Sequence, residues 1–392
     1  MRNSFKGNKM PTIKPFSNFF SQTDPHTLQN IKTVIDYLAK VYHAKCYVVG
    51  GAVRDRLLGR ECKDYDIECF GIEVEDFEKA MEHLGAHGVG KSFFVYKYKE
   101  IDFSLPRIEK KVGEGHKGFE VSLAREEKEA SKRRDFTVNA LMYDIQNKQI
   151  FDFWNGLEDL EHKVLRVVDK NLFVEDSLRV LRAMQFAARF GFKVEDVSCK
   201  LCQNISLDDL PKERLFIEFE KMFKGTYLHY GLYYLFALGI AQKLFSEKID
   251  KKIFITLAKN LQKNKKNFIE NLRPYYFLFI CKQYFQIDSI ELLNRLAAPN
   301  NYYKKLATPS AQNVNMEFVA NLSRKEGIVA YVGNYHTRVI KLAKELDVWD
   351  KPFDGGVTPS ALMAEGFRGK ALGDELERRT VEKIKELKEK QV

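Results

Sequence analysis

Residues 46–71 read CYVVGGAVRDRLLGRECKDYDIECFG, and the order of features in this stretch decides the fold. An apolar run, typical of a buried strand, ends at the glycine pair Gly50 and Gly51. Because glycine has no Cβ, the backbone can come close to a ligand and point its N–H groups at phosphate oxygens. Arg54 follows one helical turn later, where its guanidinium can bind the same phosphates. The stretch thus predicts a phosphate-binding turn, although glycine pairs also occur in turns that bind nothing.

Two carboxylates follow at the head of the next apolar run. Asp64 and Asp66 are two residues apart, and in a strand such residues face the same side. Two carboxylates on one face raise each other's pKa unless a cation lies between them, and Mg²⁺ prefers oxygen ligands. We therefore expect Asp64 and Asp66 to be catalytic and to bind Mg²⁺, with a solvent-facing polar strand edge as the alternative. Asp102, in a later strand-like run, is a candidate for a third catalytic acid on a neighbouring strand.

The composition is that of a basic globular chain. Of its 392 residues 45% are hydrophobic, and the formal net charge is +10 at pH 7. This excess favours a polyanionic partner such as nucleic acid, with lysine used only for solubility as the alternative. No apolar run reaches the length of a membrane span and the N-terminus lacks a signal-peptide core, so we expect a soluble, cytoplasmic protein. The six cysteines are expected to be reduced thiols.

Helical and strand-like patterns alternate up to about residue 155. Residues 26–42 have the apolar spacing of a helix, and residues 65–71, 92–105 and 139–153 are rich in β-branched and aromatic side chains. From residue 175 onward the spacing is almost wholly helical. The order of strand, Gly-Gly, Arg and D-x-D resembles the nucleotidyltransferase fold that polymerase-β-like enzymes share. The expected fold is therefore an α/β nucleotidyltransferase head followed by an all-α neck, body and tail.

Four ordered motifs carry a closer resemblance. The sequence is similar to the class II tRNA nucleotidyltransferases, which are the bacterial and eukaryotic CCA-adding enzymes, and to the related bacterial poly(A) polymerases. The matching segments are GGAVRD (50–55) with DYD (64–66), RRDFTVNAL (133–141), EDSLRVLRAMQFAARFGF (175–192) and KERLFIEFEKM (212–222), and GVTPSALMAEGFRGKALGDEL (356–376) looks like the family's tail.

The resemblance implies a reaction and a set of site residues. The 3′-hydroxyl of a tRNA attacks the α-phosphorus of CTP or ATP, without a nucleic-acid template, and pyrophosphate leaves. Asp64 and Asp66 would hold two Mg²⁺ ions for this step. The residues that would bind the nucleotide are Gly50, Gly51, Arg54, Arg134, Asp135, Asn139, Asp176, Arg179 and Arg182.

Base choice has a chemical explanation in the neck motif. Asp176 and Arg179 are three apart and are therefore neighbours on a helix. Cytosine and adenine each present an amino donor beside a ring-nitrogen acceptor, which suits a carboxylate paired with a guanidinium. Guanine and uracil present the opposite polarity. The resemblance implies that Asp176 and Arg179 accept C and A in this way; the alternative is an ordinary surface salt bridge.

The expected organisation has five parts. They are an arm (1–25), the head (26–155), the neck (156–222), a helical body (223–310) and a tRNA-binding helical tail (311–392). A Gly-rich loop between residues 105 and 133 is expected to help the site switch from C to A, or to be an uninvolved hinge. The alternatives to full CCA addition are poly(A) synthesis, addition of only CC or only A, and a noncatalytic RNA-binding module.

Overall fold

The structure is a computed structural model that describes residues 10–62, 64–90, 94–111, 119–245, 250–282, 289–311 and 313–389. The described chain forms two compact units. The first contains the residues up to Ala183 together with Gly191–Leu210 and Ala237–Lys243. The second contains Met184–Phe190, Pro211–Phe236 and the residues from Leu244 onward. The Gly-rich segment 112–118, which is the centre of the expected loop, lies outside the described residues.

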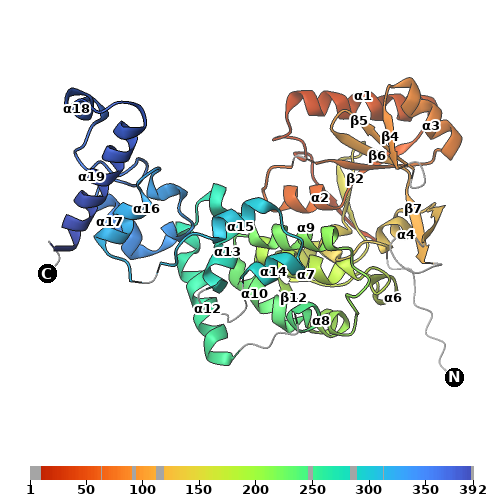
Figure 1. Cartoon of the computed structure of the whole chain (residues 1–392). Helices are drawn as coiled ribbons and strands as arrows, with labels where there is room; N and C mark the ends of the chain where they lie inside the picture. Colours follow the sequence, from red (N-terminus) through yellow and green to blue (C-terminus); the bar gives the residue numbers. More distant parts are fainter. Residues whose placement is uncertain are drawn as a thin grey trace. The chain divides into compact units, whose positions relative to one another are not determined.

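The first unit is built on a mixed sheet of eight described strands (Figure 1). Their spatial order is β1 (Thr12–Pro15), β10 (Gln149–Asp152), β9 (Met142–Asp144), β2 (Lys45–Val49), β3 (Asp66–Phe70), β6 (Ile101–Ser104), β5 (Val95–Tyr98) and β4 (His87–Gly90). The antiparallel pairs β5–β6 and β9–β10 are formed by two of the runs that the sequence predicts to be strands. The α/β head expected from the sequence is thereby confirmed.

One face of the sheet is covered by α1 (Pro25–Tyr42) and α3 (Val74–His83), as Figure 1 shows. The apolar stripe of α1, which the sequence predicts, is buried there against alternate residues of the central strands. On β3 these inward residues are Ile67 and Cys69, so the pleat turns Asp66 and Glu68 to the opposite face. The hydrophobic core therefore lies on one side of β3 and its acidic residues lie on the other.

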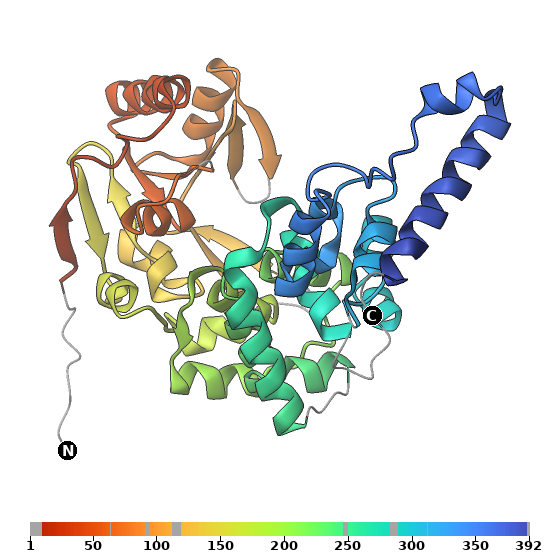
Figure 2. The same cartoon turned by 90° about the vertical axis from the view of Figure 1, so that its left-hand side faces the viewer.

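The segment before α1 differs from the expected arm. β1 pairs antiparallel with β10 at the edge of the sheet, which Figure 2 shows on its left side. Phe19 is fully buried and stacks on Tyr143, with ring centroids 4.1 Å apart. Arg56 donates from Nε to the carbonyl oxygen of Phe19 at 2.6 Å. Burial of this aromatic side chain explains why a mostly polar segment is attached to the head.

The other elements of the first unit surround the acidic face and continue into the neck. They are α2 (Gly51–Leu57), β7 (Arg107–Lys111), β8 (Phe119–Leu123), α4 (Glu127–Lys132), η2 (Thr137–Asn139), α5 (Gly156–Glu161), β11 (Val164–Leu165), α6 (Lys170–Phe173), β12 (Lys193–Val194) and α8 (Asp196–Gln203). α7 (Leu178–Phe190) belongs to the first unit as far as Ala183, and α11 (Ile240–Phe245) as far as Lys243. The two-residue parallel pair β11–β12 is a small addition to a region expected to be wholly helical.

The second unit is helical, as expected. Its further elements are α9 (Lys212–Phe223), α10 (Leu228–Ala237), α12 (Lys251–Asn264), η3 (Lys265–Asn267), η4 (Glu270–Leu272), α13 (Arg273–Lys282), α14 (Ser289–Arg295), α15 (Asn300–Leu306), α16 (Met316–Leu322), η5 (Ile328–Ala330), η6 (Val332–Tyr335), α17 (Thr337–Glu345), α18 (Pro359–Ala364) and α19 (Gly369–Glu389). Aromatic contacts hold its core, for example Phe223 stacked on Phe277 with centroids 5.6 Å apart. None of the described helices is both long and apolar enough to cross a membrane.

Candidate active site

The glycine pair forms the turn between β2 and α2. Gly50 has φ +72°, a left-handed conformation that glycine adopts at little cost. A Cβ built on Gly50 would lie 3.2 Å from Nη1 of Arg134, so the first motif and the second motif meet at this turn. Gly51 is the first residue of α2, and a Cβ built on it would lie 3.4 Å from Nη2 of Arg54. The geometry leaves the turn's backbone beside two arginine side chains.

Arg54 is more deeply buried than its expected role as a phosphate ligand suggests. The residue is 4% exposed. Its Nε and Nη2 donate to the carboxylate of Asp55 at 2.9 and 3.0 Å, and its Nη1 donates to Oδ1 of Asn139 at 2.5 Å. Asn139 in turn donates from Nδ2 to Oδ1 of Asp135 at 2.8 Å. Arg54 therefore ties α2 to the second motif.

The acids expected to be catalytic lie on adjacent strands. β3 and β6 run parallel, and their register places Asp66 directly beside Asp102. Directly paired residues of neighbouring strands face the same side, so both carboxylates are on the face away from α1. Asp64 is exposed two residues before Asp66, just ahead of β3. Lys97 on β5 lies with Nζ 3.4 Å from Oδ1 of Asp102.

The surroundings of Asp66 disfavour its charge. Desolvation raises its pKa, the charge of Arg134 partly opposes that rise, and the charges of Asp102, Glu68 and Asp64 add to it. The net effect is a pKa above the ordinary value, although the side chain reaches solvent. A divalent cation would relieve this repulsion, so the three aspartates have the donor chemistry of a Mg²⁺ site. Within the described residues, however, no three acidic, histidine or cysteine side chains already converge as metal ligands.

Glu68 belongs to the site and was not anticipated. It follows Asp66 by two residues on β3, and its Oε1 accepts hydrogen bonds of 2.7 Å from both Arg133 and Arg134. The signal was present in the sequence, because Asp64, Asp66 and Glu68 continue the same two-residue alternation. Sequence reasoning stopped at the D-x-D pair.

Asp135 connects the head to the first turn of the neck. It is 5% exposed, and its Oδ2 accepts a 2.6 Å bond from Nε of Arg182 on α7. Burial alone would raise the pKa of Asp135, but the charge of Arg182 and the bonds from Asn139 and Arg182 lower it below the ordinary value. The carboxylate is therefore ionised at neutral pH. Asp135 and Arg182, both expected to contact the nucleotide, here form an ion pair.

The two residues expected to select the base lie at the start of α7. Arg179 donates to the carbonyl oxygens of Leu172 at 2.8 Å and Arg133 at 2.9 Å. Its Nε is 3.9 Å from Oδ2 of Asp176, which is too long for a hydrogen bond. Oδ1 of Asp176 accepts from the backbone N–H of Leu178 at 3.1 Å. The pair is adjacent, as the helical spacing predicts, and Arg179 is anchored to the second motif through Arg133.

The structure thus gathers the sequence-predicted residues in the first unit. The Gly50 turn meets Arg134, the Arg54–Asn139–Asp135–Arg182 chain links α2 to α7, and Asp66 lies beside Asp102. Asp64 is exposed nearby in sequence. The arrangement has an acidic sheet face next to a basic cluster, which suits a metal-bound polyphosphate.

Comparison with protein families identifies two segments. Residues 46–166 match the family described as the poly A polymerase head domain. Residues 191–251 match the family described as the probable RNA and SrmB-binding site of polymerase A. The first match contains the Gly50 turn, Asp64, Asp66, Glu68, Asp102 and Asp135, and it ends before Asp176.

Curated relatives match over about half of the chain. The multifunctional CCA protein of Pasteurella multocida (strain Pm70) is 37% identical over 214 residues, which are 52% of this chain and 50% of that protein. The multifunctional CCA protein of Nitrosospira multiformis is 40% identical over 182 residues, which are 44% of this chain and 43% of that protein. The chain therefore spans about half the length of the curated relatives it matches.

Solved structures resemble the fold along nearly the whole chain. The Thermotoga maritima CCA-adding enzyme complexed with tRNA has a TM-score of 0.64 at 22% identity, covering 98% of this chain and 100% of that one. The Bacillus stearothermophilus CCA-adding enzyme in complex with CTP has a TM-score of 0.63 at 22% identity, covering 91% and 92%. The likeness shows a polymerase-β-like head followed by a helical region. Residues 46–166 and 191–251 are thus similar in sequence to the two poly A polymerase families, and the described chain has the fold of the CCA-adding enzymes.

Proposed function

We propose that the protein is a CCA-adding tRNA nucleotidyltransferase that uses CTP and ATP and acts in the cytoplasm. The observation that carries the proposal is the placement of Asp66 beside Asp102 on the same sheet face, next to the turn where Gly50 meets Arg134. A triphosphate needs positive charge and backbone donors, and its reacting phosphorus needs a metal held by carboxylates. Both requirements are met by residues of the first unit. The names of the sequence relatives favour CCA addition over the poly(A) alternative.

We assign the metal ligands to Asp64 and Asp66, with Asp102 as a further acid, and Mg²⁺ as the ion. When bound, the ion would neutralise phosphate charge and lower the pKa of the attacking hydroxyl. Arg134 and the backbone at Gly50 and Gly51 would hold the triphosphate, which fixes the α-phosphorus for attack by the RNA 3′-oxygen. Pyrophosphate would leave toward the same basic cluster.

Four of the residues expected to bind the nucleotide are assigned a supporting role in this proposal: Arg54, Asp135, Asn139 and Arg182. Their hydrogen bonds to one another support a role as a frame beneath the nucleotide site, in which Arg182 is the partly exposed member. A frame of this kind keeps the rotamers of the contacting side chains fixed. Asp176 and Arg179 would read the Watson–Crick edge of the incoming base, with Arg179 oriented by the two carbonyl oxygens that it binds.

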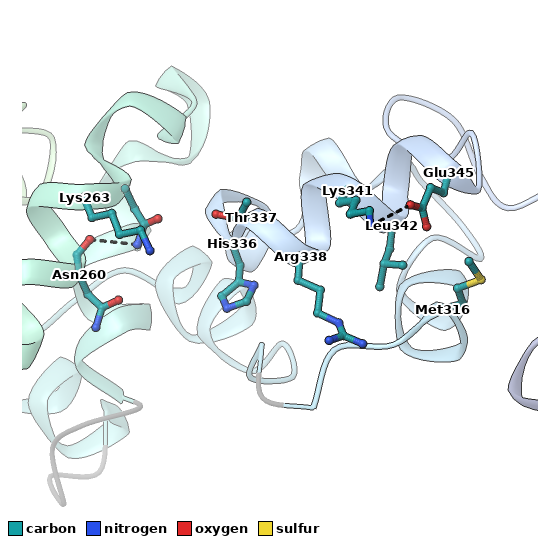
Figure 3. Close-up of a pocket in the computed structure, with 10 residues that line it drawn as sticks. Asn260, Lys263, Met316, His336, Thr337, Arg338, Lys341, Leu342 and Glu345 are labelled. Carbon is teal, nitrogen blue, oxygen red and sulfur yellow. Dashed lines mark hydrogen bonds and ion pairs between the residues drawn. The ribbon is translucent and has the colours of Figure 1, made fainter. Parts of the chain in front are cut away.

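A basic pocket in the second unit supports an RNA partner. Its volume is about 670 Å³ and it lies between α12 and α17 (Figure 3). Figure 3 shows Lys263, His336 and Arg338 around it, and Lys341, whose Nζ is 3.6 Å from the carboxylate of Glu345. Lys263 and Arg338 have no ion-pair partner among the residues described. Burial lowers the pKa of His336, and the positive charges of Lys263 and Arg338 lower it further, as expected for an imidazole beside two cations. We assign this pocket to backbone phosphates of tRNA.

The function is tested by product length. Purified protein is incubated with Mg²⁺ and tRNAs that end at the discriminator base, at C or at CC, with CTP and ATP singly and together. We expect extension that stops at CCA, and loss of it in Asp64→Ala and Asp66→Ala variants. A long ladder with ATP alone would identify a poly(A) polymerase, and a stop at CC, or addition only to the CC end, would identify a partial enzyme. Unchanged extension by both variants would refute the metal assignment, and no extension by native protein would favour a noncatalytic RNA-binding module.

A further inference from the structure

Glu68 is a buried carboxylate that the proposed chemistry does not use directly. Its side chain is 1% exposed, and Oε1 accepts 2.7 Å hydrogen bonds from Nη2 of Arg133 and Nη2 of Arg134. Both donors are guanidinium groups, so these are charge-assisted hydrogen bonds, which are stronger than those between neutral groups.

The pairing leaves positive charge in the site. One carboxylate is shared by two guanidinium groups, and these are 15% and 20% exposed at Arg133 and Arg134. While Nη2 of Arg134 is held by Glu68, its Nη1 lies over the turn, 3.2 Å from where a Gly50 Cβ would be. A guanidinium presents its donors in a rigid plane, so fixing one side of it fixes the direction of the other. Glu68 thus sets which way Arg134 faces.

Strand β3, which carries Glu68, also carries a second carboxylate that could bind Arg134. Asp66 lies two residues before Glu68 on the same face of β3, which is the face where Arg134 binds Glu68. Without the charge of Glu68, Asp66 becomes an alternative anion for Arg134. An arginine bound to Asp66 would occupy the carboxylate that the proposed function needs for the metal.

We propose that Glu68 is a positioning residue, which holds Arg133 and Arg134 beside the Gly50 turn for the triphosphate and keeps Arg134 from pairing with Asp66. This inference rests on the proposed function. It concerns nucleotide and metal binding, and it assigns no bond-making step to Glu68.

The test compares Glu68→Gln with the native protein. Binding of an α,β-methylene analogue of CTP, which cannot react, is measured calorimetrically over a series of Mg²⁺ concentrations. Loss of a charge-assisted hydrogen bond is expected to weaken analogue binding about tenfold and to raise the Mg²⁺ concentration required. In steady-state addition the KM for CTP should rise, with kcat at saturating CTP and Mg²⁺ changed much less. Glu68→Asp, which keeps the charge, should recover part of the affinity.

Glu218→Gln is the matched control. Glu218 on α9 is a 2% exposed carboxylate bound to Lys221 at 2.7 Å, and among the described residues its Oε2, like that of Glu68, has no hydrogen-bond partner. It lies in the second unit, so this variant should lose stability without losing affinity for the analogue. Equal effects of the two variants on affinity would overturn the proposal.

Two further outcomes are decisive. Native affinity of a folded Glu68→Gln variant for both analogue and Mg²⁺ would refute a positioning role. If that variant does not fold, Arg133→Gln is tested instead. This variant leaves the bond between Glu68 and Arg134 in place, so it should require the native Mg²⁺ concentration for analogue binding. A higher required Mg²⁺ concentration in Arg133→Gln would contradict the proposal. A native protein that binds the analogue but extends no RNA would refute the proposed function while leaving the comparison of affinities valid.

Discussion

Arg179 is oriented by main-chain atoms, as the base recognition assigned to it in the proposed function requires. Its two bonds to the carbonyl oxygens of Leu172 and Arg133 fix the guanidinium plane, and Asp176 lies alongside without a hydrogen bond to it. Two preset groups, one accepting and one donating, can distinguish bases by edge polarity. Mispairing with guanine or uracil would leave buried polar groups unsatisfied, which is the physical source of strong discrimination.

Removing either member should relax base choice. For Arg179→Ala and Asp176→Ala we expect the ratio of kcat/KM for CTP over UTP to fall at least about tenfold. In each variant UTP no longer meets the polar group that it would leave without a hydrogen bond, so the free-energy cost that rejects UTP is reduced. The measurement is single-nucleotide addition to a tRNA that lacks CCA, with each of the four nucleotides. Lys200→Ala, which removes an exposed cation on α8, serves as the control and should keep the native ratio. Native discrimination in both pair variants would contradict the assignment.

The raised pKa of Asp66 gives a prediction with a defined sign. Like charges favour the protonated carboxyl, so removing the charge of Asp102 should move the pKa of Asp66 downward, toward the ordinary value. We expect this shift in Asp102→Asn, measured by carbon NMR of labelled aspartate in metal-free protein. Asp55→Asn changes a carboxylate outside the β3–β6 pair and should leave the pKa of Asp66 nearly unchanged. An unaltered or higher pKa in Asp102→Asn would show that the two carboxylates do not interact.

Among the elements, those with a strong periodic signal were predictable from the sequence. The stripe of α1 and the strands β3, β6 and β9 were all expected near their observed bounds, because amphipathic spacing and burial agree there. Thr358 caps α18, accepting from the N–H of Ala361 at 3.2 Å. β1 was missed, since it forms by pairing with β10, which is distant in the sequence. Long-range contacts of this kind leave no local pattern.

The same distinction applies to the site. Motif spacing predicted the glycine turn, the closeness of Asp64 to Asp66 and that of Asp176 to Arg179, because the members of each lie within a few residues of one another in the sequence. It did not predict that Arg54 would be buried by Asn139, or that Glu68 would bind two arginines, because those contacts join residues more than sixty positions apart. Parallel pairing of β3 with β6 likewise had to be seen before Asp102 could be placed beside Asp66.

Close packing between η2 and α5 provides a stability prediction. A Cβ on Gly156 would lie 2.3 Å from the carbonyl oxygen of Thr137, a backbone atom that cannot rotate away. Gly156→Ala should therefore cost about 1–3 kcal/mol of unfolding free energy, the usual range for overpacking. Urea denaturation can be followed through Trp154, in a Trp349→Phe background that leaves one tryptophan. Gly373→Ala, in α19 with open space around the added methyl, should be neutral or stabilising. A stable Gly156→Ala would show that η2 can move.

For the whole molecule, the pocket of the second unit is one place where cations of this basic chain lie together. The net charge predicted a polyanionic partner without distinguishing solvated lysines from ligands. The pocket separates them, because Lys263 and Arg338 line one cavity, whereas Lys251 and Lys252 lie at the other end of α12, outside its lining. Cations that converge on a concave site interact with a phosphate more strongly than isolated surface cations.

Replacing Lys263 and Arg338 together by glutamine tests this assignment. Binding of tRNA is measured without nucleotide, so that no addition occurs, over a series of salt concentrations. Each lost phosphate contact should reduce the slope of log affinity against log salt by about 0.7–0.9, so we expect a reduction of roughly 1.5 and weaker binding. The control Lys251→Gln/Lys252→Gln removes the same charge outside the pocket and should change the slope less. If the two double variants behave alike, RNA is held by diffuse charge. A site for free phosphate would not contribute to RNA binding. If inorganic phosphate competes at millimolar concentration but the double variant keeps the native slope for RNA, the ligand of the pocket is a small anion.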